Sequence, residues 1–323
     1  MTSTYFLTGA LGCIGAWVAK TLVERGDHAV VFDSDDRRHR LDAVIDPGHR
    51  DELSFVQGDV TDARAVAAAM QGSGAESVIH LAGLQVPSCR EDPARGAAVN
   101  VVGTLNVFDA ARTCGVTRVV YASSAAVFGP MPDGTVPDET AAPDPQTHYG
   151  VFKRANEGNA RVYWQDHGLA TVGLRPLTVY GVGRDQGLTS GPTRAMKAAV
   201  LGRPFHIGFS GATDYQFVAD TAETFVACAD RSPRGACLYN LQGDSVDLSR
   251  IVALIRERRA TAEITFDGPE IPVPAALDGA AIHRDILGLP ATPLEEGVSR
   301  TMDRFQRLLD AGRLDTTDVE QGR

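Results

Sequence analysis

The chain has 323 residues, of which 43% are hydrophobic and 22% are charged, and its formal net charge is −10. This composition is ordinary for a globular protein, and the length suits one large domain or two closely joined ones. The acidic balance argues against nucleic acid as a partner, because phosphate binding needs clustered Lys and Arg. No apolar run approaches the length of a bilayer crossing, and the N-terminus has no signal segment, so we expect a cytoplasmic protein without a membrane partner.

The five cysteines are odd in number and scattered along the chain, at Cys13, Cys89, Cys114, Cys228 and Cys237. None of them belongs to a CxxC pair or to a Cys/His cluster. The cysteines are therefore expected to be structural thiols, with no disulfide framework and no metal site.

The most informative segment is a glycine-rich turn between a short apolar run at residues 5–7 and a predicted helix at 14–25. Glycine permits a tight turn, and the free amides at the helix start then face an anion, helped by the positive end of the helix dipole. The pattern TGxxGxxG over residues 8–15 therefore predicts a dinucleotide pyrophosphate site. Its predicted cofactor contacts are Gly9, Leu11, Gly12, Cys13, Ile14 and Gly15.

The next predicted strand, at residues 29–32, ends at Asp33. A carboxylate at this place can accept both hydroxyls of the adenosine ribose and would repel a 2′-phosphate, so NAD is predicted as the cofactor rather than NADP. Arg37, Arg38 and Arg40 lie just downstream and could bind that phosphate. The alternative is a solvated loop in which neighbouring aspartates pair with them, and we favour it because Asp33 holds the strand end.

Strand-like and helix-like stretches alternate through the first half, which is typical of a parallel, doubly wound sheet. Further strands are predicted at 53–57, 77–81, 118–122 and 171–174, and helices at 63–70, 95–114, 149–167, 193–201, 248–258 and 292–309. We therefore expect an α/β fold with a Rossmann-type sheet over residues 1–175. A smaller substrate-binding region should cover 176–314, with parts returning to the sheet, and residues 315–323 should form a disordered tail.

Three side chains suggest chemistry at an alcohol carbon. Tyr149 and Lys153 stand four residues apart on one face of a predicted helix. An ammonium nearby favours the phenolate, so Lys153 should lower the pKa of Tyr149 from about 10 and make it a base for a hydroxyl proton. Ser124 follows the strand at 118–122, at the carboxyl end of the sheet, where open α/β sheets bind their ligands.

Together these motifs resemble the extended short-chain dehydrogenases/reductases of the NAD-dependent epimerase/dehydratase family. Residues 58–62 resemble the family's adenine-contacting turn, 80–83 the strand under the nicotinamide ribose, 100–106 the central helix and 123–129 the segment with the catalytic Ser or Thr. The resemblance implies that Ser124, Tyr149 and Lys153 form the catalytic triad, with Lys153 also on the nicotinamide ribose. Further cofactor contacts are implied at Asp59, Val60, Leu81, Ala82, Gly83, Asn100, Tyr149 and Lys153. Asn100 fits a core-bridging amide equally well.

Departures from the family pattern bear on the reaction. Family dehydratases carry acids straight after the catalytic serine, where this chain has Ala125 and Ala126, which argues against dehydration. Nucleotide-sugar epimerases usually contact the substrate diphosphate through an Asn and an Arg, which are replaced here by Thr178 and Thr213. Each lost charged hydrogen bond costs about 1.5–3 kcal/mol. Three basic residues could compensate: Arg184, Arg194 and Lys197.

The leading prediction is an NAD-dependent oxidoreductase acting on a secondary alcohol of a sugar, sugar acid or related polyol, with Tyr149 as general base. The alternative is a UDP-sugar 4-epimerase with tightly bound NAD, and a third possibility is a non-catalytic NAD-binding regulator. Substrate contacts are expected, from position, at Ser123, Ser124, Ala125, Thr178, Arg184, Thr189 and Ser190. The resemblance also implies a homodimer formed through the helices predicted at 95–114 and 149–167.

Overall fold

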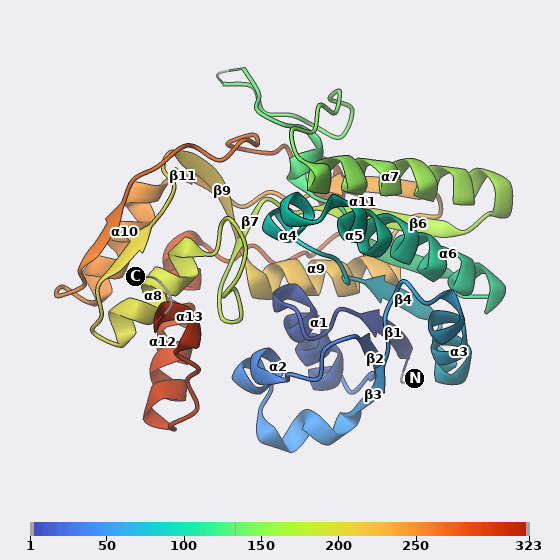
Figure 1. Ribbon diagram of the computed structural model, residues 1–323, viewed down its shortest axis with the longest axis horizontal. Helices are drawn as coiled ribbons and strands as arrows, with labels where there is room; N and C mark the ends of the chain where they lie inside the picture. The colour runs from blue at the N-terminus through green and yellow to red at the C-terminus, as the bar shows by residue number, and fades with distance from the viewer. Residues whose placement is uncertain (1–2, 133, 321–323) are drawn as a thin grey trace.

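The computed structural model describes residues 3–132 and 134–320 (Figure 1). The strands are β1 Thr4–Thr8, β2 His28–Asp33, β3 Leu53–Gln57, β4 Ser77–His80, β5 Arg118–Ala122, β6 Ala170–Arg175, β7 Thr178–Tyr180, β8 Phe205–Ile207, β9 Ala212–Phe217, β10 Ala236–Asn240, β11 Asp244–Asp247 and β12 Ile264–Phe266. The α-helices are α1 Cys13–Glu24, α2 His39–Val44, α3 Ala63–Ser73, α4 Val86–Glu91, α5 Pro93–Ala97, α6 Gly103–Thr113, α7 His148–His167, α8 Gly191–Val200, α9 Val218–Arg231, α10 Leu248–Arg258, α11 Ala280–Asp285, α12 Leu294–Asp310 and α13 Thr317–Glu320. Short 3₁₀ turns lie at Pro47–Glu52 and Ala125–Val127, and a π turn at Ala98–Val102.

The central sheet has the strand order β10-β6-β5-β4-β1-β2-β3, and its pairings are all parallel. Side chains along each strand alternate between two cores. In β1, Tyr5 and Leu7 pack with α1 and α9, whereas Phe6 packs with α3 and α6 on the other face. A sheet buried on both faces reads as continuous apolar runs in the sequence. The predicted Rossmann-type architecture is confirmed, with its topological switch between β1 and β4.

The second half of the chain adds two small sheets and a group of helices at the left of Figure 1. Strand β9 pairs with β7 in parallel and with β11 antiparallel, while β12 pairs with β8. Helices α8, α10 and α12 pack against one another. However, β10 lies in the central sheet beside β6, and α9 packs against α1, so this region contributes to both halves of the molecule.

The helix predicted at 95–114 is interrupted. Helices α5 and α6 are joined by the π turn, which contains Asn100. The buried Asn100 carboxamide accepts from the Leu84 amide at 2.7 Å and donates to the Leu84 carbonyl at 2.9 Å. π turns insert a residue into a helix and are frequent at functional sites. Apolar spacing along a sequence does not reveal such an insertion.

The end of the chain differs from the expected disordered tail over 315–323. Residues 315–320 are ordered and include α13, which packs on α8, while 321–323 lie outside the described residues. Lys197 Nζ lies 2.7 Å from Asp318 Oδ1, and Arg194 donates to the Asp318 carbonyl. The polar composition of the tail suggested disorder. Two cations of α8, which is far from the tail in the sequence, bind Asp318 and hold the segment in place.

A buried ion pair joins helix α7 to the sheet. Arg175, at the end of β6, donates to Glu157 of α7 through Nε at 2.7 Å and Nη2 at 2.9 Å. Ser123 Oγ donates to the same carboxylate at 2.7 Å, and both charged side chains are at most 1% exposed. Bidentate pairing and the added hydroxyl compensate the desolvation of these charges.

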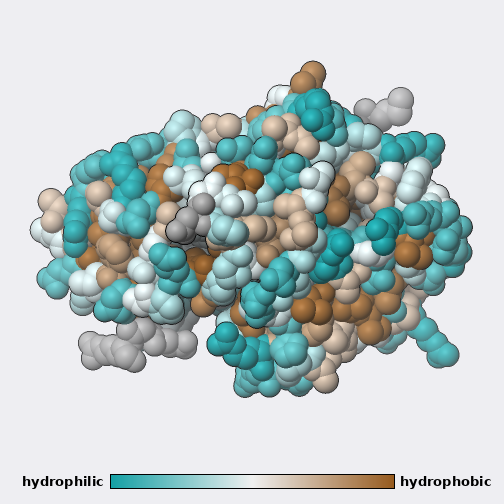
Figure 2. Space-filling view, turned by 90° about the horizontal axis from the view of Figure 1, so that it is seen from above, coloured by the Kyte–Doolittle hydropathy of each residue, from teal (hydrophilic) through white to brown (hydrophobic). Residues whose placement is uncertain are grey.

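The side of the molecule formed by α6 and α7 exposes apolar side chains. Val102 precedes α6, and Val151 and Val162 on α7 lie three helical turns apart and so share a face; each of the three is about half exposed. Figure 2 shows apolar surface on this side of the molecule when it is seen from above. None of the helices in the described part of the chain combines the length and apolar character needed to cross a membrane.

Removing the acid of the buried pair should destabilise the fold strongly. Glu157→Gln leaves the Arg175 guanidinium buried and uncompensated, so the free energy of unfolding should fall by about 3–5 kcal/mol. Urea unfolding at pH 7 measures this change. As a control, Arg250→Gln on α10 removes two exposed ion pairs, with Glu257 and with Glu295, and should leave the unfolding midpoint nearly unchanged. A similar small effect of both variants would contradict the assigned role of the pair.

Candidate active site

The glycine turn between β1 and α1 brings the helix start close to the end of β4. Gly9 has φ +72°, and a Cβ there would lie 2.5 Å from the Ala82 amide nitrogen. A Cβ on Gly15 would lie 2.2 Å from the Gly9 carbonyl oxygen, so both positions need glycine. Helix α1 begins without a side-chain cap, which leaves its first amides open to an anion. This cradle fits the pyrophosphate of a dinucleotide.

Asp33 ends β2 beside this turn. Its carboxylate accepts from the Leu11 amide at 3.0 Å and from the Asp35 amide at 3.2 Å. Burial raises the pKa of Asp33, although these two hydrogen bonds oppose the rise. The remaining lone pairs of the carboxylate suit ribose hydroxyls, as expected for NAD.

Each of the downstream arginines has a partner within the protein. Arg37 pairs with Asp35, as expected for a solvated loop, and Arg38 stacks on the Phe55 ring at 3.8 Å. Arg40 instead pairs across the fold with Asp185. This last contact joins segments 145 residues apart, so the local sequence could not indicate it.

The other predicted cofactor residues divide into three pairs. Leu81 and Gly83 line the cavity that begins at the glycine turn. Asp59 is exposed and accepts from the Thr61 amide, whereas Val60 is buried against Gly103. The remaining two support the backbone: Ala82 donates its amide to a Thr8 hydroxyl, and Asn100 has the core-bridging bonds described above.

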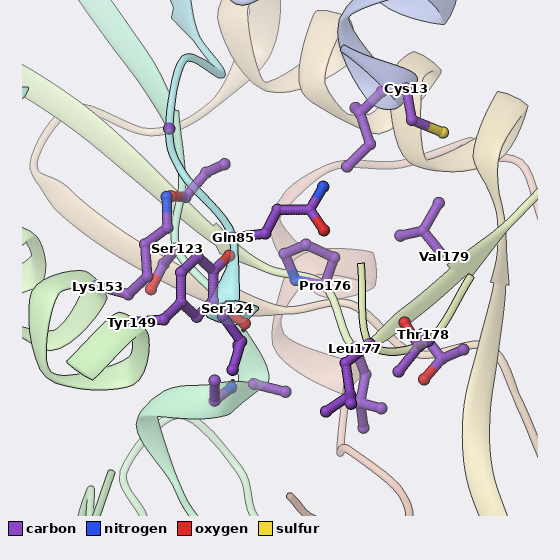
Figure 3. A pocket seen from close by; sticks show the side chains of 18 of the residues that line it. Cys13, Gln85, Ser123, Ser124, Tyr149, Lys153, Pro176, Leu177, Thr178 and Val179 are labelled. Atoms are coloured by element: carbon purple, nitrogen blue, oxygen red, sulfur yellow. Dashed lines mark hydrogen bonds between the residues drawn. The ribbon is translucent and has the colours of Figure 1, made fainter. Parts of the chain in front are cut away.

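Ser124, Tyr149 and Lys153 meet in one cavity of about 230 Å³, which also reaches Gly9, Gly12, Cys13, Ile14 and Gly15. Figure 3 shows Ser123, Ser124, Tyr149 and Lys153 on one side of the cavity, with Leu177, Thr178 and Val179 opposite. The serine comes from the end of β5 and the other two catalytic candidates from α7. The structure therefore brings the predicted triad to the predicted cofactor cradle.

The side chain of Lys153 is hydrogen-bonded to the backbone. Its Nζ donates to the Ala122 carbonyl at 2.8 Å and lies 5.4 Å from the centre of the Tyr149 ring. Burial lowers the pKa of Lys153 to about 8. Its ammonium is thus held beside the end of β5, next to Gly83.

The pKa of Tyr149 differs from the expectation that Lys153 lowers it. Burial raises the pKa of Tyr149, and the influences that oppose burial are a hydrogen bond with Ser124 and the positive charge of Arg184. Lys153 donates to the Ala122 carbonyl, and burial lowers its own pKa to about 8, so the lysine loses its charge before the phenol ionises. Arg184, from the loop after β7, is the cation that sequence reasoning did not connect with the phenol.

The predicted substrate residues are only partly together. Ala125, Thr178, Arg184 and Thr189 line the cavity, as does Ser124. Ser123 also lines it, but its hydroxyl is bonded to Glu157. Ser190 is buried at the start of α8 and is not among the lining residues.

The two replaced diphosphate positions touch each other. Thr178 lies on β7 and Thr213 on the neighbouring β9, and their hydroxyls are 2.9 Å apart in the buried interior. Arg194 and Lys197 do not compensate for them, because both are bonded to the C-terminal segment and neither lines the cavity. Arg184 is thus left as the candidate cation for a substrate anion.

Several lining residues were not anticipated. Gln85 at the start of α4 and Leu177 after β6 face the cavity, as do Ile271 and Val273 from the loop between β12 and α11, which has prolines at 269, 272 and 274. The sequence marks that loop by its prolines, but no local pattern says that it folds over the carboxyl end of the sheet. The described residues hold no cluster of His, Cys, Asp or Glu arranged for a metal ion.

A model of the NAD dependent epimerase/dehydratase family matches residues 5–241. The chain belongs to this family. NAD is accordingly its cofactor, in agreement with the glycine cradle and Asp33. The match covers the central sheet, the triad and β9, and it ends just after β10.

Individual relatives extend over nearly the whole chain. The UDP-glucose 4-epimerase of Mycolicibacterium smegmatis is 30% identical over 312 residues, covering 93% of this chain and 97% of the relative. Among solved structures, the Thermus thermophilus UDP-glucose 4-epimerase in complex with NAD has a TM-score of 0.82 at 26% identity, covering 94% of this chain and 99% of that one. A partial consensus L-threonine 3-dehydrogenase has a TM-score of 0.81 at 25% identity, with the same coverages.

The bond between Ser124 and Tyr149 predicts how the rate depends on pH. A general base must be deprotonated to accept a proton, so with Tyr149 as the base the rate of alcohol oxidation should rise with pH through the pKa of Tyr149. The Ser124 bond lowers that pKa, so Ser124→Ala should raise it and move the acid limb of the rate profile to higher pH. Turnover measured across a pH series, as sugar interconversion or as NADH formation, tests this shift. If the acid limb of the rate profile does not move in Ser124→Ala, the bond between Ser124 and Tyr149 does not set the pKa that limits the rate.

Tyr149→Phe should lose roughly 10²–10⁴-fold in kcat while its affinity for NAD stays nearly unchanged.

Proposed function

We propose that the chain oxidises a secondary alcohol on a sugar or sugar-derived substrate, using NAD, with Tyr149 as general base. The observation that carries this proposal is the meeting of Ser124, Tyr149 and Lys153 in the cavity that begins at the glycine cradle. When bound, NAD supplies the hydride acceptor. Every other part of the chemistry falls to side chains of this chain.

The proposed roles follow from position. The substrate hydroxyl gives its proton to Tyr149 Oη, and Ser124 Oγ holds the same oxygen in line with the phenol. Lys153 keeps a positive charge near the reacting end while its bond to the Ala122 carbonyl fixes its place.

The first candidate reaction is 4-epimerisation of a UDP-sugar, with NAD kept bound through the cycle. Its support is that relatives named UDP-glucose 4-epimerase cover nearly the whole chain, the second half included. Sequence reasoning placed this reaction second, and the relatives reverse that order. Arg184 would then be the cation available to a diphosphate in the cavity.

The second candidate is net dehydrogenation of an unactivated sugar acid or polyol. It is favoured by Thr178 and Thr213, which satisfy each other's hydroxyls and leave no cation at those positions. A diphosphate normally takes several charge-assisted hydrogen bonds. The similarity to an L-threonine 3-dehydrogenase shows that this architecture also serves a dehydrogenase.

For the partner, we propose a second copy of this chain packed through α6 and α7. The half-exposed Val102, Val151 and Val162 give this face an apolar character that a partner would cover. Light scattering on the intact protein should read a mass of two chains, and Val151→Glu with Val162→Glu should halve it. A wild-type mass of one chain would contradict the proposal.

A substrate panel separates the two reactions. The purified protein is given NAD or NADP and, in turn, UDP-glucose, free aldoses and aldonates, and the NADH absorbance is followed together with the sugar products. Interconversion of a UDP-sugar without net NADH, with NAD co-purifying, supports the epimerase. Net NADH from an unactivated polyol supports the dehydrogenase.

The same substrate panel can also contradict the proposed function. Bound NAD without turnover of any alcohol would leave a non-catalytic NAD-binding protein and would contradict both candidates. Preference for NADP over NAD would contradict the assignment of Asp33 as a ribose ligand.

A further inference from the structure

The loop between β7 and α8, residues 181–190, lies over the glycine cradle. We refer to it as the strap. On one side it is held by the Trp17 indole, which donates to the Val182 carbonyl at 2.8 Å. Gly183 faces the Cys13 backbone, and a Cβ there would lie 3.8 Å from Cys13 Cα. The strap therefore covers the place where the first amides of α1 are open.

An ion pair ties the strap to the cradle. Asp185 accepts from Arg40 Nε at 2.9 Å and from Arg40 Nη2 at 2.7 Å, and His39 Nε2 lies 3.2 Å away. Arg40 Nη1 also donates to the Leu11 carbonyl in the glycine turn at 2.8 Å. Although burial opposes it, hydrogen bonds from His39 and Arg40 lower the pKa of Asp185 to about 2, so the anchor stays charged.

Arg184, the neighbour of this anchor, points into the cavity with its charge unneutralised. Its Nη2 donates to Thr189 Oγ1 at 3.0 Å, and Nη1 lies 3.5 Å from Gln85 Oε1, so both partners are uncharged. Its Nε is buried without a hydrogen-bond partner. Among the described residues no carboxylate lies within ion-pair distance of Arg184, although the neighbouring Asp185 neutralises Arg40.

A half-buried guanidinium with free donors and no counterion is a site for an oxyanion, because planar N–H pairs match phosphate and carboxylate oxygens. Arg184 lies close enough to both Cys13 and Tyr149 to influence their pKa values, so it stands between the cradle and the reacting end. The open amides of α1 favour negative charge in the same region.

We propose that Arg184, held in place by the strap, is the anion-binding residue of the cavity and clamps a phosphate or carboxylate group over the glycine cradle. The proposal rests on the proposed NAD-dependent function. The bound anion could come from two sources, which are the pyrophosphate of the cofactor and an acidic group on the substrate. Asp185 and Arg40 are positioning residues, since they act through the strap.

The test measures binding rather than turnover. Arg184→Met and Arg184→Lys are compared with wild type by calorimetry for NAD alone, and then for UDP-glucose and for glucuronate in the presence of saturating NAD. Loss of the charged hydrogen bonds should weaken the ligand that supplies the anion by roughly 10- to 100-fold in Arg184→Met. Arg184→Lys should recover part of that affinity, because it keeps the charge without the planar fork.

Arg284→Met is the matched control, since Arg284 is exposed on α11 and pairs with Asp285 away from the cavity. It should leave each dissociation constant within about twofold of wild type. Melting temperatures of all variants, which should agree, separate a loss of binding from a loss of fold.

The pattern of losses identifies the source of the anion. Weaker NAD binding assigns the cofactor pyrophosphate, whereas weaker binding of UDP-glucose or glucuronate with unchanged NAD affinity assigns the substrate. If Arg184→Met binds every ligand that wild type binds with equal affinity, the proposal is overturned. Because no arm needs turnover, Arg184-dependent binding in an inactive protein would count against the proposed function alone.

Discussion

The buried pair of Glu157 and Arg175 holds together the elements on which the site depends. Glu157 lies one turn after Lys153 on α7, so the same helix face that carries the catalytic candidates is locked to the end of β6. The shared carboxylate also takes the Ser123 hydroxyl, which fixes the backbone next to Ser124. One carboxylate thus sets the distance between the serine at the end of β5 and the tyrosine and lysine on the helix. Chemistry that needs hydrogen-bond contact between these side chains depends on that fixed spacing.

The features that sequence reasoning predicted correctly are those encoded over short stretches. The glycine turn, the acid at the end of β2 and the parallel sheet each depend on residues close together in the chain and on regular periodicity. The same holds for Tyr149 and Lys153, whose spacing alone puts them on one side of a helix. Family membership then follows, because these short patterns occur in a fixed order along the chain, and the family match over residues 5–241 agrees with them.

The features that sequence reasoning missed depend on contacts between side chains and partners that are far apart in the sequence. Lys153 is bonded to the Ala122 carbonyl, and Arg184 influences Tyr149 in its stead, so the pKa of the phenol could not be inferred from the spacing of two residues. The contact between Thr178 and Thr213 shows the same limit, since two separate departures from a pattern become one hydrogen bond once β7 and β9 pair. The ordered C-terminal segment has a similar cause, because its partners lie on α8.

The anchoring of the strap bears on how long a dinucleotide stays in place. Lifting residues 181–190 from the cradle would separate Asp185 from Arg40 and His39 and would expose the Trp17 indole. An enzyme that regenerates its own oxidant within each cycle never needs that movement, and a slow exchange of dinucleotide does not limit its speed. If the dinucleotide is bound beneath the strap, an enzyme that releases reduced dinucleotide breaks these contacts at every turnover. How long these contacts persist therefore bears on whether the protein can exchange its dinucleotide at each turnover or must keep one molecule bound through many cycles.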